Sequence, residues 1–292
     1  MPESREYKTA SALRTALETR LQKLAKLHQA DIQRLRRRVA FDRFLARLFG
    51  SERGHDYPWI LKGGYAMELR MQLARATKDI DLAIPTGASG KLAQASGDAI
   101  RILLQETASS PLPDGFTFMI GEAKLELGAA PQGGSRFPIQ ANMGGRTFAR
   151  FSLDVGIGDE LIEPVEIVEG EGWFDFAGLP RPEFRMISRE QQFAEKLHAY
   201  TLPRTGAENT RAKDLVDLLL LLRMSLDSAR AGDSIRRTFA GRNTHPVPIE
   251  LDQPPSSWQA RFDVLASECN LRVDMNAAFE QVAEYFAVIR RE

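Results

Sequence analysis

The segment that most constrains the fold is one in which a glycine pair precedes an aspartate pair. Leu61-Lys62-Gly63-Gly64 ends a short apolar stretch, and Asp79-Ile80-Asp81 begins an alternating segment that continues to Ile84. The period of two predicts a strand with both carboxylates on one face. Residues 65–74 have helical character. The segment therefore predicts a strand, a glycine turn, a helix and a second strand that carries two carboxylates.

These residue types suit binding of a metal and a phosphate. Carboxylate oxygens are hard ligands, and Mg²⁺ is commonly held by one or two carboxylates together with substrate phosphates. Glycines before a helix let the backbone approach a phosphate, and the helix N-terminus offers free N–H groups. Lys62 would add a positive charge. A lone aspartate pair or a lone glycine turn is usually only structural, but their combination predicts a nucleotide site with Mg²⁺ or Mn²⁺.

A two-metal site needs a further carboxylate from a neighbouring strand. Asp154 interrupts the alternating apolar pattern of Phe151-Ser152-Leu153-Asp154-Val155 and is our candidate. Asp159 and Glu160 are nearby competitors. Asp154 could instead be an exposed strand residue or a turn residue beside Gly156. We prefer it because it lies inside a predicted strand, where it can face the strand of the aspartate pair.

A second group of charged residues lies in two predicted helices further along the chain. Asp214 and Asp217 are three residues apart and share a helix face. Asp217 lies in a leucine-rich run, where an unpaired charge is costly, so it needs a partner such as Lys196 or Arg211. A lysine near the triphosphate would stabilise charge on a leaving pyrophosphate. Intrahelical ion pairs are the alternative interpretation for Glu195, Lys196 and Lys213.

The pattern along the chain predicts a sheet domain followed by a helical domain. Residues 8–49 are predicted as two helices, and segments 116–120, 136–141 and 147–155 as antiparallel strands. Residues 161–187 are mixed and predicted as a connection. Helices dominate from Ser188, which with Gln191 forms a capping-box-like start. We expect N-terminal helices packing on the core over 1–56, an α/β domain over 57–187 and a helical domain over 188–292.

Charge is balanced overall but not along the chain. The 39 Lys and Arg match 39 Asp and Glu, yet residues 1–56 contain 13 basic and 7 acidic residues, a net charge of +6. The cluster Arg34, Arg36, Arg37 and Arg38 is either a solvated helix face or a contact for a nucleic-acid backbone. One Cys excludes a disulfide framework. Without a signal peptide or a long apolar run, the chain is expected in the cytoplasm and not in a membrane.

Several of these stretches resemble the AbiEii-type nucleotidyltransferases, the toxins of type IV toxin–antitoxin pairs, which include MenT-like toxins. The resemblance is carried by Leu61-Lys62-Gly63-Gly64-x-Ala66-x-x-Leu69-Arg70, by Arg75-x-Thr77-Lys78-Asp79-Ile80-Asp81-Leu82, and by Ala194-Glu195-Lys196-Leu197-x-Ala199 with Arg211-x-Lys213-Asp214-x-x-Asp217. It implies an α+β fold: a polymerase-β-like mixed sheet with flanking helices, followed by a helical bundle. It also implies Mg²⁺-dependent transfer of a nucleoside monophosphate from an NTP.

The resemblance also implies roles for individual residues. Asp79 and Asp81 would bind the metal, and Asp154 is matched only by its position in a strand and by a loose Leu-Asp-Val-x-x-Gly-Asp pattern. Asp214 would be an essential carboxylate. The wider superfamily has Gly-Ser where this chain has Gly-Gly, which removes a hydroxyl from the phosphate loop. Thr77 would be a hydroxyl in reach of the site and a target of self-modification, or it would only start the strand, which is the interpretation we prefer. The nucleotide-binding set would be Lys62, Gly63, Gly64, Lys196, Arg211 and Lys213.

Three functional hypotheses follow. The first is a toxin that transfers NMP to RNA, with the tRNA 3′ end as acceptor and a cognate antitoxin as partner. The second keeps the fold and the NTP but modifies a protein or a small molecule. The third is a catalytically inactive binding protein of a defence complex, which the retained aspartates argue against.

Overall fold

The computed structural model describes residues 7–50, 59–71, 74–85, 96–126, 131–203 and 211–290, and these form two compact units. The first, called the sheet unit, comprises Met1–Leu69, Thr77–Asp159 and Glu166–Met186. The second, called the helical unit, comprises Arg70–Ala76, Glu160–Val165 and Ile187–Glu292. Each unit is described by itself.

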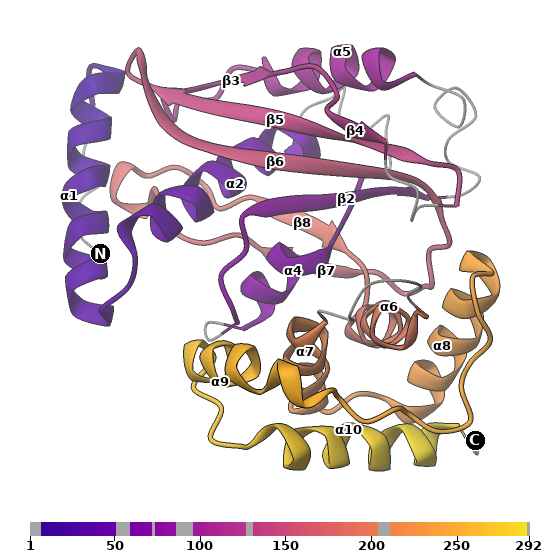
Figure 1. Cartoon of the computed structure of the whole chain (residues 1–292). Helices are drawn as coiled ribbons and strands as arrows, with labels where there is room; N and C mark the ends of the chain where they lie inside the picture. Colours follow the sequence, from indigo (N-terminus) through magenta and orange to yellow (C-terminus); the bar gives the residue numbers. More distant parts are fainter. Residues whose placement is uncertain are drawn as a thin grey trace. The chain divides into compact units, whose positions relative to one another are not determined.

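The sheet unit is built on one mixed sheet (Figure 1). Its strands run in the order β3-β5-β6-β2-β1-β8-β7, and the short β4 pairs with β5. The pairs β2–β6 and β1–β8 are parallel and the others antiparallel. The strands are β1 (Ile60–Lys62), β2 (Asp79–Pro85), β3 (Phe116–Ile120), β4 (Leu125–Glu126), β5 (Gly134–Met143), β6 (Arg146–Asp159), β7 (Glu166–Glu169) and β8 (Glu183–Met186).

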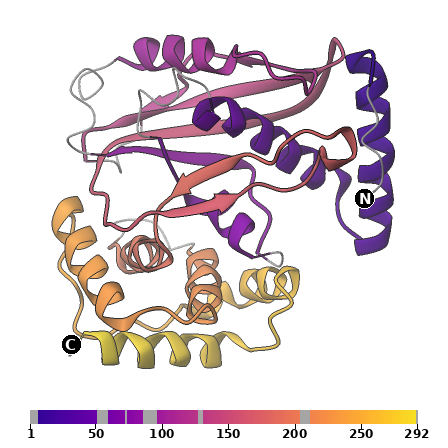
Figure 2. The ribbon, with the colours of Figure 1, turned by 180° about the vertical axis from the view of Figure 1, so that it is seen from behind.

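Among the residues that the structure describes, the α-helices that accompany this sheet are α1 (Ala10–His28), α2 (Ile32–Gly50), α4 (Gly63–Arg70) and α5 (Gly97–Ala108). Helix α2 packs against β6 and β8, and α5 packs against β3 and β5 (Figure 2). Alternate strand residues such as Ile80, Leu82 and Leu153 join the core with Phe41 and Phe44 of α2. Because side chains alternate across a strand, Asp79, Asp81 and Asp154 lie on the opposite face of the sheet from α2.

The helical unit surrounds one apolar helix. It consists of α6 (Arg189–Thr201), α7 (Ala212–Leu222), α8 (Ser228–Arg242), α9 (Gln259–Glu268) and α10 (Met275–Ile289). Helix α7 packs against α6, α9 and α10, and its leucines are buried except Leu222, which is partly buried. The hydroxyl of Ser188 accepts the N–H of Gln191 at 3.1 Å, which confirms the predicted start of α6.

The predicted α+β class is confirmed, whereas the interpretation of residues 161–187 as a connection was wrong. They contribute β7 and β8, an antiparallel pair at one edge of the sheet. Each strand has only four residues, and the alternation is too short to be recognised beside the surrounding prolines and glycines. None of the helices within the described residues is long and apolar enough to cross a membrane.

Candidate active site

A row of four charged residues crosses the polar face of the sheet. Strand register places Lys62 of β1 opposite Asp81 of β2, Asp81 beside Asp154 of β6, and Asp154 opposite Arg136 of β5. Residues paired in this way project to the same face. Two acidic residues are thus flanked by one basic residue on each side. We call Lys62, Asp81, Asp154 and Arg136 the charged row.

Asp79 lies on the same face, two residues before Asp81. Its carboxylate Oδ1 accepts the hydroxyl of Thr77 at 2.9 Å, and its side chain is 39% exposed. The backbone N–H of Thr77 donates to Oε1 of the buried Glu68 at 2.6 Å. Glu68 therefore holds Thr77, and Thr77 orients the Asp79 carboxylate.

Both glycines of the pair are required by the side chains of this site. Gly63 has φ +68°, and a Cβ built there would lie 1.9 Å from Oδ2 of Asp81. A Cβ on Gly64 would lie 2.6 Å from Oγ1 of Thr77. A side chain at Gly63 would therefore collide with a carboxylate and strain the backbone. The two glycines therefore leave space for the side chains of Asp81 and Thr77. They are also the first two residues of α4.

Two ion pairs fix the ends of the charged row. Arg136 donates from Nε and Nη2 to the two carboxylate oxygens of Asp154, both at 2.6 Å. Lys62 pairs with Asp159, which is also buried. Asp154 is thus beside Asp81, as its place in a strand predicted, but its carboxylate is bound to an arginine. Asp159, the competitor at the sequence level, binds Lys62.

The donor set fits one divalent ion better than a metal cluster. Among the described residues, no group of three or more His, Cys, Asp and Glu side chains is arranged to hold a metal. Asp79 and Asp81 supply two hard carboxylates from one face of one strand, which is sufficient for Mg²⁺ when phosphates complete its coordination.

The helical unit contains a separate buried charge cluster around Lys196. Its ammonium lies 2.7 Å from Asp217 and 3.4 Å from Asp214. Arg75 donates to both oxygens of Asp217 at 2.9 and 2.8 Å, and Arg211 lies 3.3 Å from Asp214. Asp217 therefore has the expected partner Lys196. It also has Arg75, which sequence reasoning missed although Arg75 begins one of the quoted motifs.

Burial and charge act against each other in this cluster. Burial lowers the pKa of Lys196, but Asp217 and Asp214 outweigh it and the net pKa is raised. Burial raises the pKa of Asp217, but Lys196 and Arg75 bring the net pKa below its usual value. Burial lowers the pKa of Lys213 in spite of Asp214. Lys196 and Asp217 are therefore both charged at neutral pH, while Lys213 loses its proton more readily than an exposed lysine.

The arginine cluster of α2 is bound to carboxylates of the sheet unit. Arg34 lies 3.1 Å from Glu68, and Arg36 lies 2.8 Å from Glu18. Arg37 lies 4.0 Å from Asp31, and Arg38 pairs with both Glu68 and Glu171. This arrangement favours the structural interpretation of the cluster over a backbone contact.

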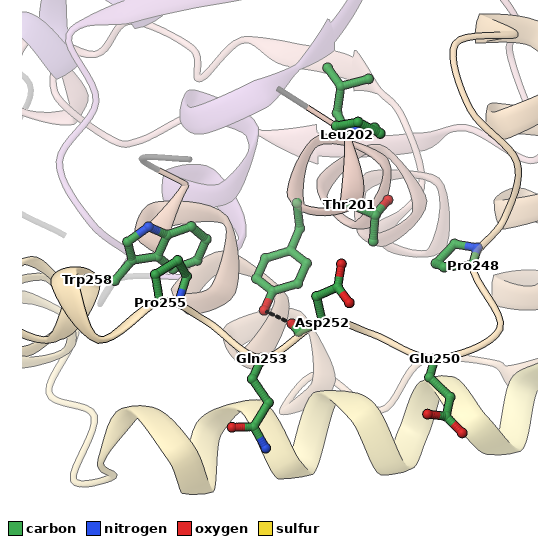
Figure 3. Close-up of a pocket in the computed structure, with 10 residues that line it drawn as sticks. Thr201, Leu202, Pro248, Glu250, Asp252, Gln253, Pro255 and Trp258 are labelled. Atoms are coloured by element: carbon green, nitrogen blue, oxygen red, sulfur yellow. Dashed lines mark hydrogen bonds between the residues drawn. The ribbon is translucent and has the colours of Figure 1, made fainter. Parts of the chain in front are cut away.

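A concave pocket of about 330 Å³ lies within the helical unit (Figure 3). Tyr200, Asp252 and Trp258 are among its lining residues, and the hydroxyl of Tyr200 donates to the carbonyl of Asp252 at 2.8 Å. Prolines form much of the remaining wall. None of the predicted site residues lines this pocket, so it is distinct from the charged row.

Comparisons with known proteins address the fold and the family. The family model "Nucleotidyl transferase AbiEii toxin, Type IV TA system" matches residues 43–285. MenT4, a nucleotidyltransferase toxin from Mycobacterium tuberculosis, has a TM-score of 0.51 at 16% identity, over 87% of this chain and 92% of that one. JHP933 from Helicobacter pylori has a TM-score of 0.42 at 14% identity with the same coverages. No curated protein matches. The likeness to MenT4 confirms the expected nucleotidyltransferase fold.

Proposed function

The chain belongs to the AbiEii family of nucleotidyltransferase toxins of type IV toxin–antitoxin systems, and from this premise we propose that it transfers NMP from an NTP to RNA. The acceptor we propose is a hydroxyl at the 3′ end of tRNA. The reaction would take place in the cytoplasm, and a cognate antitoxin would restrain it. The observation that carries the proposal is the charged row, with Asp79 beside it and a glycine turn opening α4.

Asp79 and Asp81 are the residues that would hold Mg²⁺. When bound, the ion would neutralise phosphate charge and favour departure of pyrophosphate. Thr77 keeps the Asp79 carboxylate in place through its hydroxyl. Gly63 and Gly64 place no side chain at the start of α4, where the positive end of the helix would face a phosphate. Lys62 adds a cation at the same edge.

The Lys196 cluster is the second part of the proposed machinery. A lysine held between two carboxylates keeps its charge and its position, which suits contact with nucleotide phosphates. Arg211 and Lys213 would add donors to the same nucleotide, and Asp214 would be essential because it fixes both Lys196 and Arg211. In-line attack by the acceptor hydroxyl on the α-phosphate would form the new phosphodiester bond and release pyrophosphate.

The test is transfer of label from each α-³²P-labelled NTP to total tRNA, followed by sequencing of RNA 3′ ends. The double variant Asp79→Asn with Asp81→Asn should lower transfer by at least ~100-fold, because the charge that attracts the metal is lost. Its thermal melt should stay near that of the wild type, since Asn keeps the shape of Asp. Arg150→Gln, a change at an exposed residue on the same face of β6, is the matched control and should retain transfer.

Retained transfer in the double variant would contradict the proposed site. Parallel incubations with protein and small-molecule pools separate the acceptors. Label in either of those pools, with none in tRNA, would replace the RNA acceptor while leaving the nucleotidyltransferase itself intact.

A further inference from the structure

Arg136 is the one member of the charged row that neither the sequence motifs nor the proposed function assigns to a role. It lies on β5, opposite Asp154 in the antiparallel register. Its guanidinium binds Asp154 through two parallel hydrogen bonds of 2.6 Å and lies 3.9 Å from Oδ2 of Asp79. The Arg136 guanidinium is thus within 4 Å of both the carboxylate on β6 and the first carboxylate on β2.

The pairing with Arg136 changes what Asp154 can do. A two-pronged guanidinium–carboxylate contact uses both carboxylate oxygens in one plane. The Asp154 side chain is only 12% exposed. A divalent ion on Asp154 would have to approach the carboxylate against the charge of the bound guanidinium. The geometry therefore disfavours Asp154 as a ligand of a second metal.

Arg136 itself remains accessible to a ligand. Its side chain is 38% exposed, and Asp154 takes only two of its five N–H donors. Arg136 donates both of these hydrogen bonds to Asp154, and an arginine guanidinium keeps its positive charge in proteins. A fixed, charged and partly exposed guanidinium is well suited to bind phosphate oxygens.

We propose that Asp154 is a positioning residue for Arg136, and that Arg136 contacts the phosphates of the nucleotide beside a single metal held by Asp79 and Asp81. This inference rests on the proposed function, because it assumes that a nucleotide binds at the charged row. It assigns the third carboxylate to an arginine instead of a second metal ion. The charge that a second metal would supply comes from the guanidinium.

The first experiment measures metal binding without nucleotide. Mn²⁺ is titrated into the full-length protein, and the free ion is followed by electron paramagnetic resonance. The wild type should bind one Mn²⁺. Asp81→Asn should weaken binding by at least ~10-fold, as expected for loss of a ligand, whereas Asp154→Asn should change it by less than about 2-fold. Arg136→Gln should strengthen it, since a cation beside Asp79 is removed.

The second experiment separates KM from kcat. Arg136→Gln should raise KM for the NTP by at least ~10-fold, because a phosphate contact is lost. Arg136→Lys should restore little of this loss, because a lysine keeps the charge without the paired donors. Asp154→Asn should resemble Arg136→Gln in KM. Arg150→Gln, which removes a cation four residues before Asp154 on the same strand, is the matched control and should leave KM unchanged.

The outcomes distinguish this inference from the function on which it rests. Absence of Mn²⁺ binding in the wild type, or an Asp81→Asn variant that binds as well as the wild type, would contradict the proposed site. If Asp154→Asn weakens Mn²⁺ binding as much as Asp81→Asn does, Asp154 is a metal ligand and the inference is wrong while the proposed function stands. An unchanged KM in Arg136→Gln would also overturn it, even if Asp154→Asn does not fold.

Discussion

At the scale of single residues, the environment of Asp42 makes the stability of the protein depend on pH. It is fully buried in α2, where its Oδ2 accepts the N–H of Glu171 at 3.1 Å and its Oδ1 lies 3.5 Å from Arg43. Burial raises the pKa of Asp42 to about 7, although Arg43 opposes the shift. Between pH 4 and 7 the folded state therefore keeps a proton that the unfolded chain releases. The Asp42 contribution makes the protein less stable as pH rises through this window.

Asp42→Asn should remove this contribution. The variant should gain roughly 1–3 kcal/mol over the wild type at pH 8, because the wild type must ionise a buried carboxyl there and the amide does not. At pH 4 the two proteins should differ little. Urea unfolding at both pH values measures the difference, and Asn retains an oxygen for the Glu171 N–H. Burial also raises the pKa of Glu171, which is present in both proteins. The quantity to compare is therefore the difference in unfolding free energy between the variant and the wild type. A constant difference at both pH values would refute the assignment.

The sequence identifies residues whose signal is local and misses those whose partners come from distant segments. Asp79, Asp81 and both glycines follow from strand period and turn chemistry within a few residues. Arg136 does not, because its place opposite Asp154 depends on the register of two long strands. Arg75 was missed for the same reason, since it pairs with Asp217 across 142 positions of sequence.

At the scale of elements, Glu68 connects α2, α4 and the start of β2. Its side chain is 1% exposed; Oε2 binds Arg34 at 3.1 Å, and Oε1 accepts the Thr77 N–H. Glu68→Gln should cost about 1–3 kcal/mol of stability, because buried donors lose a charged acceptor. It should also lower the transfer rate, since Thr77 orients Asp79. Thermal melts and rates measured below the melting temperature separate the two effects.

The matched control is Glu18→Gln, which breaks the Arg36–Glu18 pair between α1 and α2. This pair has no contact with Thr77 or Asp79, so the variant should lose stability only. Equal losses of transfer in Glu18→Gln and Glu68→Gln would show that Glu68 acts through general stability and not through β2.

Predictability at this scale depends on the length of an element. The helices and the long strands could be predicted because their periodicity persists over several repeats. β7 and β8 have four residues each. They belong to the sheet because β8 pairs with β1 on one side and with β7 on the other. No local pattern of that length separates such strands from a loop.

At the scale of the whole molecule, the neutral net charge reflects local neutralisation. Residues 1–56 carry a net charge of +6, and the rest of the chain carries −6. Each arginine of the Arg34–Arg38 cluster lies within 4.0 Å of a carboxylate of the sheet unit. The partners of Arg34, Arg36 and Arg38 come from other segments and are Glu18, Glu68 and Glu171. Arginines paired in this way contribute little to the attraction of an RNA backbone.

This leads to a prediction about salt dependence. Arg36→Gln with Arg37→Gln should change tRNA affinity by less than about 2-fold at low salt, and the slope of log affinity against log salt by less than ~0.5. If both arginines contacted phosphates, the slope would fall by about 1.5 and the affinity would drop by at least ~10-fold. Fluorescence anisotropy with labelled tRNA from 50 to about 200 mM salt distinguishes the two cases. A steep loss would mean that tRNA displaces the carboxylates and that α2 is part of the RNA interface.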